Sequence, residues 1–420
     1  MKRDWMFTIL PISAIANGLS VLIPLYILAL KGDVFDVGVA VALFNLIGIP
    51  ASLFWGDFTD KIKKNKLIIL ISIIGTIPIL LILYFIAFIP SIEASYGVYS
   101  FIATAASPAI NILIMKRNRN LSLPKYFSEY SILSILGGFI ALIPGIVLDR
   151  QNIADYLIML LVLNVIALIL AIKLIEKDRD HSTKQSKKVK QSFSLLNALS
   201  TTPHILTGYS LIERIRKAIK VRRVKNVYLL LLTMALFDAG LALFNTSYIP
   251  FLNDRGVNFA GIFIINIANY IGQLVVYTLF MYFTKRFNLA AYYETSTLLR
   301  GLSYLLAFVP FIFTSFLFFY TNIVAYLFSG VAYAMFNVAS SVMMYNQIGK
   351  LSRGHYIGIW FSILSLSTVV SSFFSGVLSQ SFNYYLTFSI AIIIILGSFI
   401  AFRSIRRSYI PELSSQKISL

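Results

Sequence analysis

The chain contains twelve long apolar segments, and almost all of its positive charge lies in every second gap between them. By hydropathy, the segments cover about residues 6–30, 34–56, 67–89, 92–115, 130–148, 154–175, 226–252, 257–283, 289–312, 316–345, 355–380 and 384–402. Of the 36 Lys and Arg residues, only Lys31, Arg150 and Arg255 fall in odd-numbered gaps, and only Arg300 lies deep within a segment. Because positively charged loops stay in the cytoplasm during insertion, we expect twelve transmembrane helices in a cell (plasma) membrane, with both termini cytoplasmic.

Composition separates this chain from soluble proteins. Hydrophobic residues make up 58% of it, the mean hydropathy is +0.81, and each segment reaches or approaches the roughly 20 residues that cross a hydrocarbon core. The net charge of +19 lies mostly in loops that would face anionic headgroups, so the bilayer is the expected partner and nucleic acid is not. The chain has no cysteine, which excludes thiol redox chemistry and cysteine metal sites. We predict no cofactor and no metal.

The two sets of six segments resemble each other. Residues 45–48 (Asn-Leu-Ile-Gly) match 269–272 (Asn-Tyr-Ile-Gly), and 131–134 match 362–365 (both Ser-Ile-Leu-Ser), at a nearly constant offset. Such duplicated units place a solute site at their interface near the bilayer midplane. We therefore predict an all-α integral membrane protein with two pseudo-symmetric six-helix bundles. The predicted parts are an N-terminal bundle (1–175), a cytoplasmic central loop (176–225), a C-terminal bundle (226–403) and a cytoplasmic tail (404–420).

The central loop changes character along its length. Its first part is polar and rich in lysine, as in a solvated linker. Over residues 209–225, Leu211, Ile215 and Ile219 recur at helical spacing among arginines and lysines. This pattern predicts a basic amphipathic helix that lies on the inner membrane surface. We expect it to be a connector that docks on headgroups, and a regulatory lipid sensor is the alternative.

Segment two ends in a charged turn over residues 55–64, in which Gly56 is followed by Asp60, Lys61 and Lys64. Gly56 would let a neighbouring helix approach closely. Asp60 can accept hydrogen bonds or meet the positive N-terminal end of another helix, and the two lysines can bridge to carboxylates. This turn resembles the signature loop of the major facilitator superfamily.

The resemblance covers about residues 5–405 and implies the fold and the mode of action of that family. It implies a secondary transporter that works by alternating access, with the turn after segment two as a latch between the halves. Asp60 would engage the start of segment eleven, near residues 354–358. The corresponding turn of the second half, residues 282–286, has neither the glycine nor the acid, so a one-sided latch is expected.

Two ionisable residues lie deep within the predicted helices, where charge is costly and each is by default a functional candidate. Asp238 and Arg300 stand about 18 and about 20 Å from the cytoplasmic ends of their helices, at the rise of an α-helix. At that depth Asp238 suits reversible protonation or cation binding, and hence coupling. The alternative is a structural Asp238–Arg300 pair in which the acid stays ionised. Glu294 lies nearer the inner surface and is expected to pair with a loop cation.

Polar side chains on the segments that line the cavity in this superfamily are the candidates for solute binding. Three of them, on segment eight, recur at i, i+3 and i+7 and so share one face of a helix. Interhelical hydrogen bonding is the alternative role for about half of the set. The candidates are Asn17, Tyr26, Asn45, Asn111, Asn245, Asn266, Asn269, Gln273 and Asn337.

We expect a monomeric secondary active transporter of a small organic solute. Proton-coupled export of hydrophobic or cationic compounds is favoured, because the many Tyr and Phe rings suit such ligands. With Arg300 as the one midplane cation, a strongly anionic substrate is disfavoured. The alternative within transport is uptake of a neutral solute such as a sugar.

Two other classes remain open. A membrane-embedded enzyme would use Asp33 and Asp36 around a metal, but the outer loops are short and two acids three residues apart are common at a helix start. We therefore predict no catalytic residue and no enzyme activity. A transporter-like sensor would bind its ligand without moving it.

Overall fold

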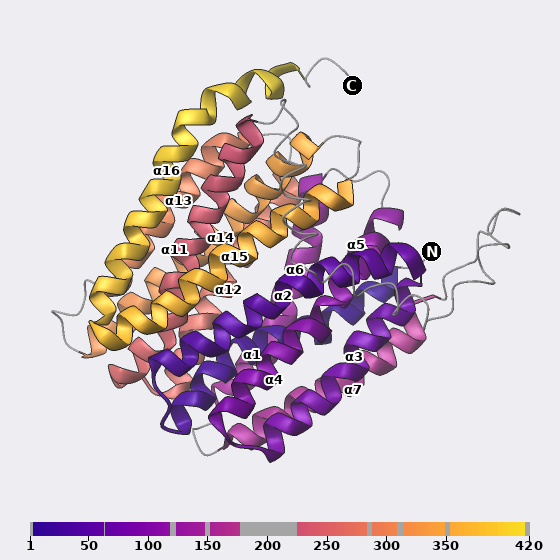
Figure 1. Cartoon of the computed structure of the whole chain (residues 1–420), viewed down its shortest axis with the longest axis vertical. Coiled ribbons are helices and arrows are strands. Elements are labelled where there is room, and N and C mark those ends of the chain that lie inside the picture. The colour runs from indigo at the N-terminus through magenta and orange to yellow at the C-terminus, as the bar shows by residue number, and fades with distance from the viewer. Residues whose placement is uncertain are drawn as a thin grey trace, which may run out of the picture.

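The structure of this chain is a computed structural model, which describes residues 3–62, 64–117, 123–147, 152–176, 225–283, 288–308, 315–348 and 353–415. Throughout these ranges the chain forms helices joined by short turns, with no β-strand. Figure 1 shows two groups of long helices, one from each half of the chain, that lie side by side. The predicted all-helical fold class is confirmed.

The helices follow the twelve apolar segments in order. In the first half they are η1 (Arg3–Thr8), α1 (Ile9–Ala29), α2 (Val34–Ile62), α3 (Asn65–Phe85), α4 (Ile89–Thr104), α5 (Ala106–Arg117), α6 (Leu123–Gly145) and α7 (Ile153–Leu174). In the second half they are α11 (Lys225–Asp254), α12 (Phe259–Phe283), α13 (Leu289–Phe308), α14 (Ser315–Ile348), α15 (Arg353–Ser381) and α16 (Tyr384–Ser415). The fourth segment is divided between α4 and α5, and the amphipathic helix predicted before Lys225 lies outside the described residues.

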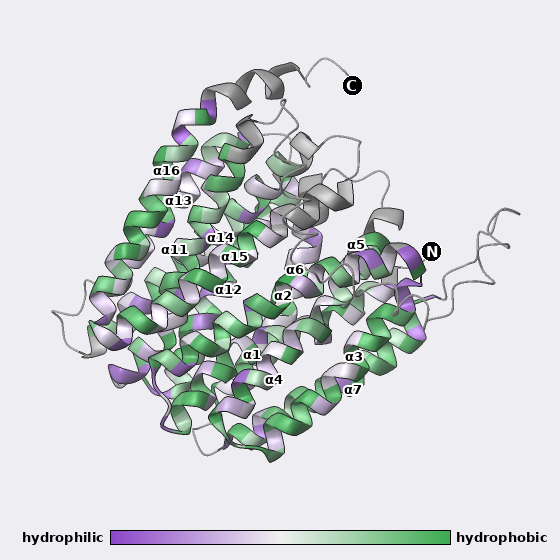
Figure 2. Cartoon of the chain, in the orientation of Figure 1, coloured by the Kyte–Doolittle hydropathy of each residue, from purple (hydrophilic) through white to green (hydrophobic). Residues whose placement is uncertain are grey.

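Hydropathy and length identify ten of the described helices as candidate membrane spans. The fourth segment is too short to count as a candidate span because its helix breaks at Ala105. Helix α13 is too polar to count, because it carries Glu294, Arg300 and several hydroxyl side chains. In the bundle α4 packs on α2 and α3, and α13 packs on α14 and α16. Figure 2 shows mostly hydrophobic helices throughout the body of the molecule, and many of the exposed residues are large and apolar, such as Phe85 and Ile393. An apolar surface of this kind suits contact with lipid.

The first helix of each half ends in the same hydrogen-bonded turn. At the end of α1, Lys31 has a φ of 66° and the Gly32 N–H donates to Ile27 O at 2.9 Å. At the end of α11, Gly256 has a φ of 79° and the Val257 N–H donates to Leu252 O at 3.0 Å. Each turn is a Schellman motif, which satisfies the last carbonyl groups of a helix. The duplication seen in the sequence thus extends to local structure.

Packing within the two halves follows the same pattern. In the first half, α1 packs on α6 and α7, α2 packs on α4, and α3 packs on α7. In the second half, the corresponding pairs are α11 with α15 and α16, α12 with α14, and α13 with α16. Between the halves, α2 packs on α15 and α6 packs on α12. Segment two of the first half thus meets the fifth segment of the second half, and segment five meets the second, as a two-fold relation between the halves requires.

Helices α12 and α14 approach until their backbones touch. A Cβ atom added to Gly272 would collide with Leu327 O, and one added to Gly330 would collide with the backbone of Asn269. Small residues permit such close approach between membrane helices, where van der Waals packing drives association. These two glycines therefore set the distance between α12 and α14.

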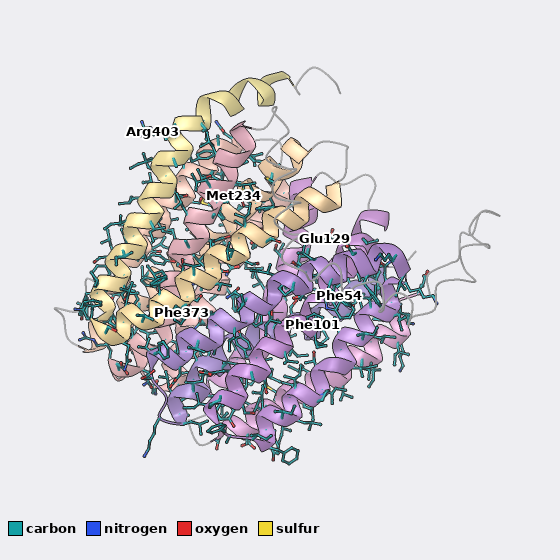
Figure 3. All side chains as sticks on the ribbon, viewed as in Figure 1. Phe54, Phe101, Glu129, Met234, Phe373 and Arg403 are labelled. Carbon is teal, nitrogen blue, oxygen red and sulfur yellow. The ribbon has the colours of Figure 1, made fainter. Side chains whose placement is uncertain are left out.

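The two halves meet on the side of the molecule opposite the chain termini, which we call the far side. A Cβ on Gly38 of α2 would lie 2.9 Å from Gly376 Cα of α15, and the Phe35 and Phe373 rings pack edge to face at 6.1 Å. At the second contact, Gly145 of α6 and Tyr156 of α7 pack on Phe263 of α12. Figure 3 labels Phe373 where α15 lies beside α2. The far side is therefore closed.

The halves separate on the opposite side, where α1 begins and α16 ends, which we call the terminus side. The Phe54, Trp55 and Phe58 rings belong there to a core cluster formed by first-half residues alone, whereas the main core cluster includes residues of both halves. A Cβ on Gly56 would meet no described residue within 4 Å. The close approach of a helix to Gly56 stays a prediction, because the side chains at the start of α15, its expected partner, lie outside the described residues.

Helix α16 continues to Ser415, well into the predicted tail. There Arg406 Nη1 lies 2.6 Å from Glu294 Oε2 of α13. The partner expected for Glu294 was a loop cation, and it is instead a cation on the extended last helix. This ion pair ties α13 to α16 on the terminus side.

We predict that Gly330→Ala lowers the stability of the protein, because the added methyl group would push α14 away from the Asn269 backbone. Overpacking of this kind costs about 1–3 kcal/mol, so the midpoint of thermal unfolding in detergent is expected to fall by several degrees. Gly397→Ala is the matched control, since a Cβ there would meet nothing within 4 Å. An equal effect of the two substitutions would contradict the proposed packing role.

We predict that cysteines placed at Phe35 and Phe373 are joined by a short bis-methanethiosulfonate reagent, because these rings face each other across the closed far side. The chain has no cysteine of its own, so the background is clean and each single cysteine variant serves as a control. Adding Gly38→Leu should reduce the cross-linking, since its side chain would hold α2 away from Gly376. Cross-linking unchanged by Gly38→Leu would argue against closure through these glycines.

Candidate functional site

A cavity of about 470 Å³ lies between the two halves. Its walls come from α1 and α6 of the first half and from α11, α12, α13 and α14 of the second. Its volume is in the range of sites for small organic molecules. The lining residues are Asn17, Ser20, Val21, Tyr130, Ser131, Ser134, Ile135, Leu241, Asn245, Ile249, Asn266, Asn269, Tyr270, Gln273, Tyr277, Arg300, Tyr326, Tyr333 and Asn337.

Most of the amides singled out in the sequence are brought together here. The cavity collects the six predicted amide residues Asn17, Asn245, Asn266, Asn269, Gln273 and Asn337. Tyr26 is not among them, because its hydroxyl donates to Leu83 O at 3.1 Å within the first-half core. Asn45 also lies apart from the cavity, and its amide donates to Val41 O of its own helix at 2.8 Å. The side chain of Asn111 lies outside the described residues.

The amides of α12 form a connected set. Gln273 Nε2 donates to Asn269 Oδ1 at 2.6 Å, and Asn269 Nδ2 donates to Tyr326 O of α14 at 3.1 Å. Asn17 Nδ2 joins α1 to Ser134 O of α6 at 3.1 Å. Asn17 and Asn269 thus combine a place in the cavity wall with interhelical hydrogen bonding, the alternative role expected for such amides, whereas Gln273 bonds within its own helix.

Arg300 lines the cavity although it is only 2% exposed. Its Nε donates to Tyr304 Oη at 2.9 Å, and its Nη1 donates to Ser329 O at 2.6 Å and also to Ser329 Oγ. Two of its three nitrogens are therefore bound by the protein. The third, Nη2, makes no hydrogen bond to the residues that the structure describes.

Asp238 lies half-buried on α11 and is not part of the cavity wall. It shares a helical face with the lining residues Leu241 and Asn245, at i, i+3 and i+7, and it stands on the terminus side of them. The two make no direct ion pair among the described contacts. The structural pair considered from the sequence is therefore not formed in this conformation.

Tyrosines complete the wall and were missed in the sequence. Tyr270 and Tyr277 of α12 lie on the same face as the predicted amides, at the spacing of an α-helix. Tyr326 donates its hydroxyl to Asn245 Oδ1 at 3.3 Å, and Asn337 donates to Tyr333 Oη at 3.5 Å. The periodicity already seen for Asn266, Asn269 and Gln273 could have identified the first two.

The predicted latch is placed only in part. Gly56 and Asp60 lie in the last turns of α2, and Lys61 and Lys64 are exposed. The side chain of Asp60 and those over residues 353–359 lie outside the described residues. No contact of the latch is therefore described, and these residues stay a prediction.

Comparison with known proteins agrees with this architecture. The family model of the Major Facilitator Superfamily matches residues 5–268 and 230–417. The search of curated proteins found no match to this chain.

Several solved structures share the fold across nearly the whole chain. A POT family transporter in complex with 5-aminolevulinic acid is 15% identical with a TM-score of 0.69, and the match covers 96% of each chain. The nucleoside transporter NupG is 15% identical with a TM-score of 0.64, over 96% of this chain and 99% of that one. The human organic anion transporter MFSD10 is 12% identical with a TM-score of 0.62, over 96% and 100%. At such identities the likeness shows the fold alone.

The family match spans most of the chain. The charged turn after segment two resembled this family, and the family's layout of twelve segments in two related halves is the one found here. The chain therefore belongs to the major facilitator superfamily, and it is a multi-pass membrane transporter rather than an enzyme.

Proposed function

We propose that this chain is a secondary active transporter that moves a small, hydrogen-bonding organic solute by alternating access. The observation that carries the proposal is the cavity of about 470 Å³ between the halves, rich in amides and tyrosines, beside a closed far side. A solute bound there would reach the other face of the membrane if the contacts at Gly38 and Gly145 opened and the terminus side closed. The charge distribution in the sequence makes the terminus side cytoplasmic.

The lining favours an uncharged or weakly anionic solute over a cationic one. Arg300 is the only charged residue among those described in the wall, and no carboxylate accompanies it. The aromatic rings could still attract a cation, but the positive guanidinium would oppose it. Of the two transport hypotheses from the sequence, the structure thus gives more support to a neutral polar solute than to hydrophobic or cationic compounds. The nucleoside and 5-aminolevulinic acid named for the similar structures are polar compounds of comparable kind.

Asp238 is the residue that we propose for proton coupling. It lies within the membrane span of α11, on the face that leads from the terminus side to the cavity. A carboxylate at this depth is costly and by default functional. Its place on the face that it shares with the lining residues Leu241 and Asn245 lets a change in its protonation reach the cavity wall as the two access states exchange.

The predicted latch fits the same cycle. If Gly56, Asp60, Lys61 and Lys64 hold the terminus side closed in the other access state, they must be released when that side opens. The absence of any described residue within 4 Å of a Cβ on Gly56 supports release.

We predict that Asp238→Asn abolishes solute-dependent proton movement in proteoliposomes under an imposed pH gradient, because the amide cannot exchange a proton. A pH-sensitive dye inside the vesicles reports the flux while neutral metabolites, sugars, nucleosides and cationic drugs are added in turn. Asp155→Asn is the matched control, since Asp155 is exposed at the start of α7. Proton movement that survives in Asp238→Asn would refute the coupling role. Solute binding without solute movement in the wild type would identify a sensor instead of a transporter.

A further inference from the structure

We infer that the solute carries one carboxylate group, or an anionic group of the same shape, and that Arg300 binds it. This inference rests on the proposed function, since it names the substrate class of the proposed transport site. The starting observation is the positive charge of Arg300 in the cavity wall, because the described wall contains no acidic side chain to balance it.

The position of Arg300 is costly unless the charge is used. The side chain is 2% exposed and lies in the middle of α13, at the depth of the membrane core. Hydrogen bonds to Ser329 and Tyr304 satisfy part of the guanidinium but bring no opposite charge. A buried cation usually has an acidic partner, and the pair with Asp238 is not formed here. No described carboxylate forms an ion pair with Arg300, so a ligand would supply the negative charge in direct contact with the guanidinium.

The guanidinium is also held in a fixed orientation. Nε is bound to Tyr304 Oη on one side, Nη1 is bound to Ser329 on the other, and the Tyr304 ring lies 5.0 Å from the guanidinium carbon. Nη2 keeps its hydrogen atoms for a further acceptor. Pre-oriented arginine donors favour planar oxygen acceptors such as carboxylates.

The rest of the wall limits the ligand to a single negative charge and adds polar contacts. Asn245, Asn266 and Asn337 are neutral and can both donate and accept. One guanidinium balances one carboxylate, and the described wall has no second cation for a dianion. The volume of about 470 Å³ suits a small molecule whose carboxylate meets Arg300 while its polar groups meet the amides.

The test compares matched acids and amides on the purified full chain. Thermal unfolding in detergent is recorded with nicotinate against nicotinamide, benzoate against benzamide, and 4-hydroxyphenylacetate against its amide. Hydrogen bonds to charged groups contribute about 1.5–3 kcal/mol, so at least one acid is expected to bind about tenfold or more tightly than its amide. Arg300→Gln should remove the preference, Arg300→Lys should keep part of it, and Arg255→Gln on the exposed far-side turn is the control.

Several results would overturn the inference. They are equal stabilisation by acids and amides, no stabilisation by any acid, or a preference for acids that persists in Arg300→Gln. The comparison of acids with amides on the wild type tests the inference even if Arg300→Gln does not fold.

Transport assays in proteoliposomes distinguish failure of this inference from failure of the proposed transport function. Uptake of neutral solutes with no preference for acids would support the proposed transport function and refute this inference. Acids that bind at Arg300 but are never transported would support carboxylate binding and refute the proposed transport function.

Discussion

The hydrocarbon core of the bilayer supplies the constraint on which the rest of this structure depends. No water is available there, so each backbone polar group must form its hydrogen bond within its own helix. The hydrophobic effect, which drives the folding of soluble proteins, contributes little to the association of helices in lipid. Association then rests on close packing and buried hydrogen bonds. Gly272 and Gly330 bring α12 and α14 into backbone contact, and Asn164 of α7 donates to Ile73 O of α3 at 3.0 Å. Glycine contacts and asparagine hydrogen bonds therefore add to the packing of the large apolar side chains in the core.

The same residue types build the cavity, which explains how a packed bundle can also recognise a solute. Asn17 and Asn269 each donate to a carbonyl of a neighbouring helix and still contribute to the cavity wall. Their positions are therefore fixed by packing before any ligand arrives. Pre-organised polar groups lose little conformational entropy on binding. Arg300 follows this rule most fully, because Tyr304 and Ser329 hold it while one nitrogen remains for a ligand.

The contacts between the halves show why two conformations are available to one fold. The pairs α2 with α15 and α6 with α12 are related by the duplication, so each half presents equivalent surfaces to the other. On the far side these surfaces meet where Gly38 and Gly376 bring α2 and α15 into backbone contact, and where the Phe263 ring of α12 packs on Gly145 of α6. On the terminus side, Phe54 and Trp55 belong to a core cluster whose described members all come from the first half. Rocking of two preformed bundles can exchange the open and closed sides with little repacking inside either bundle.

The sequence by itself determined the number and order of the helices, their duplication and the deep positions of Asp238 and Arg300, because hydropathy and helical rise are properties of the local chain. It also identified the polar face of α12, since that face has a period that can be read directly. Only the tertiary structure decided which polar residues reach the cavity. Asn45 and Asn269 are equivalent in the repeat, yet Asn45 bonds to its own helix at Val41 O while Asn269 bonds to α14 and lines the cavity. The separation of Asp238 from Arg300 and the tyrosine wall depend equally on the packing between helices. The rotation and tilt of one helix against another are set by contacts between residues far apart in the chain, and no local pattern carries that information.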